Sequence, residues 1–319
     1  MSAIPVIDLQ GTDDPAQERR VADELSRACT EVGFFVIRGH GIDKAIFDDI
    51  YERSSRFFAR PVEDKANYPM QTSTARGDND YSPYGYSALL SENAFAYTGK
   101  PGMPSDYVEK LSVGRLVLDD DEPLPLPTDD EGQALRTALR DYFGACERLA
   151  GRVSELLTIA LELPRDFFAT RTDRSNDSLR SQSYPGVREE FLNDQGMGEH
   201  TDGTLITLLT QDGPGLQLRD LSGRWLDIDV AERDSFIVNI GDLMARWSND
   251  EYVSTPHRVR LTERGRQSVV FFKLANDDAL IEAFPKFVRD RAAKYEPIRY
   301  ETFSLEKMNA LFGREEVTS

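Results

Sequence analysis

The sequence predicts an α+β protein with a helix-rich N-terminal half, an antiparallel β-sandwich or jelly roll, and C-terminal helices. Apolar residues repeat at helical spacing through much of the first half of the chain. After Leu179, short β-branched and aromatic segments alternate with turn residues. No flexible linker separates the halves, so we expect residues 1–165 to form a helix-rich region packed on a core formed by residues 166–319.

The first elements are expected to be two strands, each followed by a helix. Residues 4–9 are short and β-branched, which indicates a strand. Asp14 can cap a helix that starts at Pro15 and stops at Gly33. The next expected elements are a strand at 34–38 and a helix at 43–58.

The middle of the chain contains two irregular segments and one long helix. Residues 70–110 are rich in Tyr, Ser, Gly and Asn, so we expect loops and short strands that contact a substrate. Residues 118–132 form an acidic, proline-rich stretch, which we interpret as a solvated connector and not as a metal site. Regular apolar spacing predicts a helix over residues 133–163 that ends before Pro164.

The second half carries the strand pattern of an antiparallel sandwich. Residues 220–224 resemble a hairpin turn between two of the expected strands, and residues 278–312 return to helical patterning. The expected strands cover residues 205–210, 216–219, 225–228, 235–240 and 268–273.

Composition narrows the class of partner. The formal net charge is -18, which argues against nucleic acid and against anionic membrane surfaces. Cys29 and Cys146 both fall in helical patterns and are expected to be small buried side chains in a reducing environment. The first ten residues show no secretory signal, and no apolar run is long enough to span a bilayer. We therefore expect a cytoplasmic monomer that acts on a small molecule.

Three residues suggest a metal site. If the segment around His200 is a strand, His200 and Asp202 project to the same face because side chains alternate along a strand. His257 can supply a third ligand after intervening strands return the chain. Two histidines and one carboxylate form the facial triad of non-haem Fe(II) oxygenases. A hydrogen-bonded structural histidine is the alternative, and we assign that role to His40, which lies in a glycine-flanked turn.

A second pair of residues suggests an anion site. Arg266 and Ser268 share one face of an expected strand, and they follow His257 by nine and eleven residues. Arginine offers a planar fork of donors that matches a carboxylate, and serine adds a hydroxyl donor. An arginine inside a jelly roll needs an anion, which a metal-bound organic acid can supply. An exposed arginine on an edge strand is the alternative.

Taken together, these segments resemble the Fe(II)/2-oxoglutarate-dependent dioxygenases of the isopenicillin N synthase branch. The resemblance covers residues 4–290. IPVIDL is similar to the opening strand of that family, and GFFVIRGHGI and FFARPVEDKANY are similar to two later segments. GEHTDGTLITLL carries the H-x-D motif, NIGDLMARWSNDEYVSTPHRV matches the segment with the second histidine, and RQS occupies the R-x-S motif.

The resemblance implies a double-stranded β-helix (jelly roll) core and a role for each motif residue. His200, Asp202 and His257 would bind iron. Three residues would hold the distal carboxylate of 2-oxoglutarate: Arg266, Ser268 and Tyr184. Gln182 stands where many family members have Asn, and Phe272 matches a position near the substrate, although a core aromatic is an equal interpretation.

The implied activity couples oxidative decarboxylation of 2-oxoglutarate, with O2, to hydroxylation, desaturation or cyclisation of a small organic molecule, in natural-product biosynthesis. Two alternatives stay open at this point. One is an Fe(II) oxidase of the same scaffold that does not use 2-oxoglutarate, as in isopenicillin N synthase. That enzyme has a glutamine near its C-terminus, and residues 311–319 contain none. The other is a jelly-roll binding module that has lost its metal.

Overall fold

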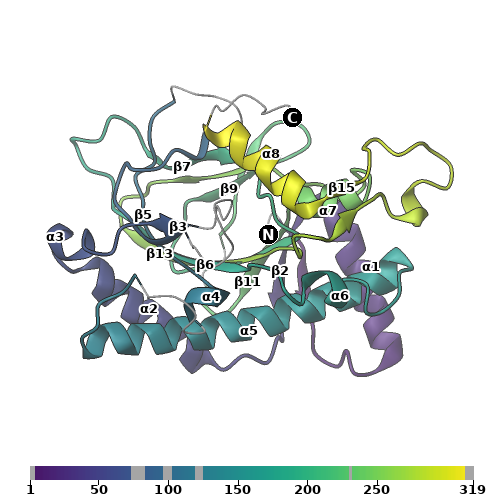
Figure 1. The fold of residues 1–319 in the computed structure, drawn as a ribbon, viewed down its shortest axis with the longest axis horizontal. Helices are drawn as coiled ribbons and strands as arrows, with labels where there is room; N and C mark the ends of the chain where they lie inside the picture. The colour runs from purple at the N-terminus through teal and green to yellow at the C-terminus, as the bar shows by residue number, and fades with distance from the viewer. Residues whose placement is uncertain (1–3, 73–82, 96–102, 119–124, 230–231, 313–319) are drawn as a thin grey trace.

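The computed structural model describes residues 4–72, 83–95, 103–118, 125–229 and 232–312. Within these residues, two β-sheets form the centre of the molecule, and the long helix α5 (Asp130–Leu161) runs beneath the larger sheet (Figure 1). The expected segments at 70–110 and 118–132 fall partly on residues 73–82, 96–102 and 119–124, which lie outside the described part.

The larger sheet has nine described strands in the order β1-β2-β11-β8-β13-β6-β5-β4-β3, and the smaller has four in the order β10-β9-β12-β7. All neighbouring strands within these sheets are antiparallel except β1 and β2. The strands are β1 (Val6–Asp8), β2 (Phe34–Arg38), β3 (Gln71–Thr72), β4 (Pro83–Ser87), β5 (Glu109–Gly114), β6 (Ser178–Tyr184), β7 (Gln195–His200), β8 (Ile206–Gln211), β9 (Leu216–Arg219), β10 (Trp225–Asp227), β11 (Phe236–Ile240), β12 (His257–Arg260) and β13 (Arg266–Lys273), with a separate pair β14 (Leu280–Ile281) and β15 (Ile298–Arg299).

The helices begin where the sequence supplies caps. Asp14 accepts a hydrogen bond from the backbone N–H of Gln17, and Asp129 accepts one from Gly132, which starts α5 earlier than its apolar repeat suggested. Gly33 follows α1 with a φ of +70°, and a Cβ there would lie 2.0 Å from the carbonyl oxygen of Val253. The helices are α1 (Pro15–Glu31), α2 (Lys44–Phe58), α3 (Val62–Lys65), α4 (Arg115–Leu118), α5 (Asp130–Leu161), α6 (Ala169–Thr172), α7 (Asp242–Trp247) and α8 (Tyr300–Phe312), with a 3-10 turn at Pro285–Phe287.

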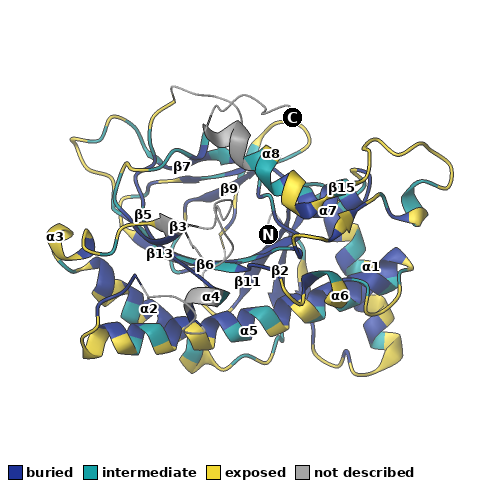
Figure 2. Ribbon diagram, viewed as in Figure 1, coloured by how far each residue is buried: buried dark blue, intermediate teal, exposed yellow. Residues whose placement is uncertain are grey.

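Strand alternation divides the core into two layers. Phe271 of β13 points toward the helices, where its ring meets Phe143 of α5 at 5.1 Å between centroids. Arg266 and Ser268 of the same strand are offset by an odd number of residues and therefore face the space between the sheets. That inner layer is lined by apolar residues of both sheets, including Val36. Figure 2 shows the buried strands and the exposed outer surfaces of the helices.

The expected antiparallel architecture is confirmed, whereas the expected helix over 278–312 is wrong in its first part. Residues 278–299 form the short β14–β15 pair, loops and a 3-10 turn, and only α8 is helical over several turns. Pro285 and Pro297 explain the difference, because proline disfavours a helical conformation in the residue before it and removes a backbone donor. No helix in the described residues has the length and apolar character to cross a membrane.

The first half of the chain contributes more strands than its helical periodicity indicated. β1 and β2 extend the larger sheet beyond β11, and β5 and β4 extend it beyond β6. Residues from both sides of position 165 therefore pair in one sheet. The division at 165 itself stays a prediction.

Candidate metal centre

The structure brings together the three residues that the sequence singled out as metal ligands. His200 ends β7 and His257 begins β12, and the two residues lie opposite each other in the smaller sheet. The Nε2 atoms of His200 and His257 lie 3.7 Å and 3.8 Å from Oδ1 of Asp202. Ligand atoms of the three residues all lie within 4.8 Å of one another. Since metal–nitrogen and metal–oxygen bonds are about 2.0–2.2 Å long, one ion can reach all three.

Hydrogen bonds fix which atom of each residue faces the centre. The Nδ1 atom of His200 lies 2.8 Å from the carbonyl oxygen of Gly198, and Nδ1 of His257 lies 3.1 Å from that of Thr255. Because a carbonyl oxygen only accepts, Nδ1 donates a proton in both rings, which leaves Nε2 as the atom that can offer a lone pair to a metal. This is the tautomer that a metal-binding histidine needs.

The carboxylate of Asp202 is oriented in the same way. Its Oδ2 accepts hydrogen bonds from the Thr207 hydroxyl at 2.7 Å and from the Asn239 side-chain amide at 2.8 Å. Oδ1 is the atom that faces both histidines. Neither Thr207 nor Asn239 was identified from the sequence, because their role depends on β8 and β11 being neighbours in the sheet.

The position of Asp202 corrects one step of the sequence argument. β7 ends at His200, so Asp202 lies in a turn and not on the strand. The turn is held from the other side, where the backbone N–H of Asp242 donates to the carbonyl oxygen of Asp202 at 2.7 Å. The two side chains thus converge as expected, although the turn and not strand alternation directs Asp202.

Electrostatics favour a neutral imidazole and an ionised carboxyl at this centre. Burial, followed by the proximity of His257, lowers the pKa of His200 to about 3. Burial raises the pKa of the Asp202 carboxyl, but the two imidazoles and the hydrogen bonds from Asn239 and Thr207 outweigh it and hold the pKa below its usual value. Two imidazoles and one carboxylate, all buried, suit a divalent cation.

The residues predicted to hold an organic acid also lie together. Arg266 pairs with Tyr184 across β13 and β6, and its guanidinium carbon lies 4.8 Å from the centre of the Tyr184 ring. Arg266 is 4% exposed. Among the described residues its Nε and Nη2 have no hydrogen-bond partner, and Nη1 reaches only the Pro214 carbonyl at 3.4 Å. An unpaired buried guanidinium is costly, so this geometry calls for an anionic ligand.

Gln182 occupies the centre of this second cluster. Its Oε1 accepts hydrogen bonds from the Tyr184 hydroxyl at 2.6 Å and from the Ser268 hydroxyl at 3.1 Å. Burial raises the pKa of Tyr184 to about 12, so the hydroxyl keeps its proton and donates. Gln182 therefore accepts the single proton of each hydroxyl in this structure, and both O–H groups must rotate away from it to donate to a bound carboxylate.

Charged side chains lie near the metal centre on the same inner face. Arg180 of β6 places its guanidinium carbon 5.3 Å from the centre of the Phe272 ring. The ammonium of Lys110, which is 2% exposed, donates to Glu92 at 2.6 Å. Burial raises the pKa of Glu92, but Lys110 and then Arg180 bring it down to about 2. None of these residues could be identified from the sequence, because they fall in the irregular segment and on strand faces.

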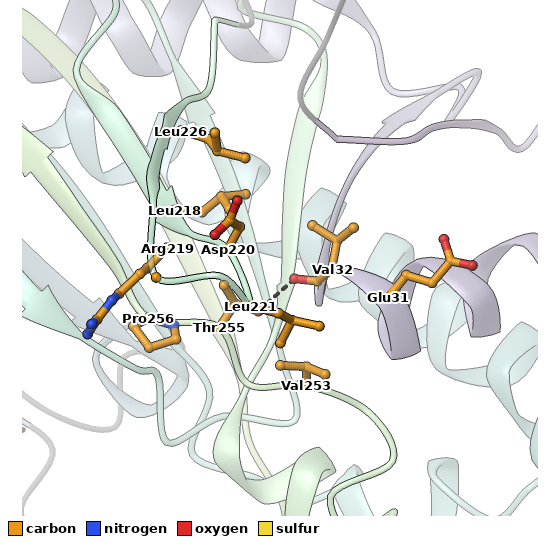
Figure 3. Close-up of a pocket in the computed structure, with 11 residues that line it drawn as sticks. Glu31, Val32, Leu218, Arg219, Asp220, Leu221, Leu226, Val253, Thr255 and Pro256 are labelled. Atoms are coloured by element: carbon orange, nitrogen blue, oxygen red, sulfur yellow. Dashed lines mark hydrogen bonds between the residues drawn. The ribbon is translucent and has the colours of Figure 1, made fainter.

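A separate cavity of about 330 Å³ is lined by the end of α1, by β9 and the turn after it, and by the loop before β12 (Figure 3). Its wall includes Leu218, which pairs with His257 across the sheet, and Thr255, whose hydroxyl donates to the Val32 carbonyl at 2.6 Å. None of the predicted site residues lines it. The cavity is thus distinct from the metal centre.

The third histidine plays the structural role that was predicted for it. The Nδ1 atom of His40 accepts a hydrogen bond from the backbone N–H of Ile42 at 3.1 Å, and its Nε2 lies 2.7 Å from the Asp234 carbonyl oxygen. Its ring packs against Phe236, with 5.3 Å between centroids. Cys29 and Cys146 are both buried, as expected.

Comparison with known proteins agrees with this geometry. Residues 4–142 match the N-terminal domain described as "non-haem dioxygenase in morphine synthesis", and residues 175–274 match the 2OG-Fe(II) oxygenase superfamily. The 2-oxoglutarate-Fe(II) type oxidoreductase hxnY of Emericella nidulans is 31% identical over an alignment that covers 99% of this chain and 92% of that protein. The chain belongs to the 2-oxoglutarate- and Fe(II)-dependent oxygenases.

Solved structures of this oxygenase family extend the comparison. A full-length Neurospora crassa protein in complex with alpha-KG has a TM-score of 0.82 and 28% identity, with 96% of this chain and 95% of that chain covered. The same Neurospora protein has also been crystallised with alpha-KG and thymine. A homoarginine-6-hydroxylase of Glycine max is 32% identical over 88% of both chains. As a member of the family, this enzyme is an oxidoreductase that uses Fe(II), 2-oxoglutarate and O2 and acts on a small molecule.

Proposed function

We propose that His200, Asp202 and His257 hold the Fe(II) ion, and that Arg266, Ser268 and Tyr184 hold the distal carboxylate of 2-oxoglutarate. The observation that carries the proposal is the presence of two complementary clusters in one protein interior. Three electron-pair donors converge in one cluster, and in the other a buried guanidinium has two nitrogens without a hydrogen-bond partner among the described residues. A keto acid that binds metal at one end and presents a carboxylate at the other complements both.

Each residue of this site contributes a physical function. When bound, the metal and the keto acid would activate O2, which would oxidise the keto acid to succinate and CO2 and leave the oxidant for the substrate. Asp202, held by Thr207 and Asn239, brings negative charge to the cation, and the histidines present fixed lone pairs. Arg266 matches a carboxylate by two parallel hydrogen bonds. The buried setting keeps water away from a reactive centre.

For the substrate, we propose a small organic molecule that is hydroxylated, desaturated or cyclised beside Phe272, in natural-product biosynthesis. Phe272 and Arg180 together offer an aromatic face and a cation on the inner face of the sheet. Thymine, which is bound in the Neurospora complex, is a planar polar molecule, and such a molecule suits an aromatic ring beside a cation. A monomeric state, a cytoplasmic location and the lack of a nucleic-acid partner stay predictions from the sequence.

One experiment tests the metal and keto-acid site without knowledge of the substrate. Fe(II) and then 2-oxoglutarate are added to the protein in the absence of O2, and the weak visible charge-transfer band of a chelated keto acid is recorded. We expect a band in the wild type, its loss in His200→Ala, Asp202→Ala and His257→Ala, and a weaker band in Arg266→Ala. Iron binding without a band would favour the 2-oxoglutarate-independent oxidase. An undiminished band in a ligand variant would remove that residue from the site.

A further inference from the structure

The turn that carries the first two proposed ligands is bound by a residue of α7. Asp242 is the first residue of that helix, and its backbone N–H donates to the Asp202 carbonyl at 2.7 Å. Its carboxylate Oδ2 accepts a hydrogen bond from the hydroxyl of Thr201 at 3.0 Å. Thr201 lies between His200 and Asp202 in the chain. One acidic residue therefore contacts the turn through both its backbone and its side chain.

The approach of α7 to this turn leaves no spare space. A Cβ on Gly241, the residue before Asp242, would lie 2.1 Å from the carbonyl oxygen of Thr204. The backbone N–H of Gly241 also points to Leu205, with 3.4 Å between the nitrogen and the carbonyl oxygen. A displacement of Asp242 is therefore transmitted to the turn by direct contact.

The same carboxylate oxygen binds a residue from the C-terminal helix. The ammonium of Lys307 donates to Oδ2 of Asp242 at 2.5 Å. Tyr300, Phe303 and Lys307 follow each other at helical spacing and lie on one face of α8. Tyr300 and Phe303 are buried. Lys307 lies on the same face of α8 as these two buried residues and forms an ion pair there (Figure 1 shows α8 on the far side of the sheets from α5).

We propose that Lys307 is a positioning residue for the iron centre: through Asp242 and Thr201 it ties the C-terminal helix to the turn that carries His200 and Asp202. The proposal rests on the proposed metal ligands. The side chain of Asp242 is 18% exposed and that of Lys307 is 42% exposed, so the ion pair is partly shielded from water. Removal of the ammonium leaves the carboxylate with fewer donors and frees the last described part of α8.

Coupling between two sites is reciprocal, which gives the proposal a distinctive signature. If the docked helix favours iron binding, iron binding must favour the docked helix by the same factor. A merely structural ion pair would stabilise the fold but would not respond to the metal. For a partly exposed ion pair we expect an effect of about two- to fivefold.

The test combines iron affinity with hydrogen exchange. Fe(II) is titrated without O2 into protein saturated with 2-oxoglutarate, and amide exchange of residues 300–312 is measured before and after loading. We expect Lys307→Met to weaken Fe(II) binding about two- to fivefold and Lys307→Arg to restore it. In the wild type, loading should slow exchange in α8, and this response should disappear in Lys307→Met.

Lys294→Met is the matched control. Lys294 forms a comparable ion pair with Asp250 at 3.0 Å, with half-exposed side chains, and Asp250 also accepts a hydrogen bond from the Tyr295 hydroxyl. It should change neither iron affinity nor the response of α8. Equal Fe(II) affinity in Lys307→Met and the wild type, or α8 exchange that is insensitive to loading, would overturn the coupling. Failure of the wild type itself to bind Fe(II) would instead refute the proposed ligands.

Discussion

Replacement of Arg266 by methionine should weaken co-substrate binding and at the same time stabilise the ligand-free protein. The guanidinium is buried, and two of its three nitrogens have no partner within the described chain. Burial also lowers its pKa below the usual value, because the charged form loses its hydration there. Methionine has a similar length and no charge, so it removes the unpaired cation without leaving a large cavity.

The size of both effects follows from the geometry. A hydrogen bond to a charged group contributes about 1.5–3 kcal/mol, so losing this contact should raise the Kd for 2-oxoglutarate by about 10- to 150-fold. A buried unsatisfied polar group costs about 1–3 kcal/mol, and the ligand-free Arg266→Met protein should gain about that much. At a 2-oxoglutarate concentration of about 100 times the wild-type Kd, binding stabilises the wild type by about 2.7 kcal/mol. A variant with 100-fold weaker affinity gains only about 0.4 kcal/mol under that condition.

Equilibrium unfolding in urea, with and without 2-oxoglutarate and a divalent metal, measures both quantities. Arg266→Lys keeps the charge but loses the planar fork, so it should stay close to the wild type in ligand-free stability and bind 2-oxoglutarate weakly. Arg258→Met is a control outside the cluster, because Arg258 stacks on Trp225 at 4.0 Å and donates to Gln217 at 2.8 Å. A destabilised ligand-free Arg266→Met protein with unchanged 2-oxoglutarate affinity would show that Arg266 is a structural residue.

Two further predictions concern the surroundings of the metal centre. A Cβ on Gly198 would lie 2.6 Å from the Phe95 ring, so Gly198→Ala should lower the free energy of unfolding by about 1–3 kcal/mol. A Cβ on Gly151 would meet no atom within 4 Å, so Gly151→Ala should instead raise the free energy of unfolding by about 0.5–1 kcal/mol. Equal changes for the two variants in urea unfolding would contradict this reasoning. Lys110 and Arg180 lower the pKa of Glu92 from 4.5 to about 2, so Glu92 stabilises the fold above pH 4.5 and this contribution is lost as pH falls toward 2. Glu92→Gln should therefore cost about 3 kcal/mol at pH 7 and much less at pH 3, and a pH-independent cost in urea would refute the ionised state.

The sequence was most informative where chemistry depends on residue type and order. His200, Asp202, His257, Arg266 and Ser268 could all be identified because each belongs to a short motif, and the structure brings them into two clusters. The direction of Asp202 was derived from strand alternation, yet a turn produces it. The prediction that His200 and Asp202 converge is therefore correct, although the strand geometry from which it was derived is not the one that the chain adopts at Asp202.

The supporting residues could not be found in this way because their roles depend on contacts between distant strands. Gln182 meets Ser268 only because β6 and β13 pair in one register, and a shift by one residue would turn both side chains to the opposite face. Asn239 and Thr207 reach Asp202 from two neighbouring strands for the same reason. The helix predicted from apolar spacing is also wrong near Pro297, where the chain forms a short strand.

The order of strands in the larger sheet has a consequence for synthesis of the chain. β1 and β2 occupy the edge next to β11, so residues 6–38 cannot complete their pairing until residues 236–240 have been made. During translation, the early β-strands must wait with unpaired backbone edges for most of the chain to leave the ribosome. Such long-range pairing slows folding and exposes the nascent protein to aggregation. Fragments that stop before β11 should therefore accumulate as insoluble material or depend on chaperones.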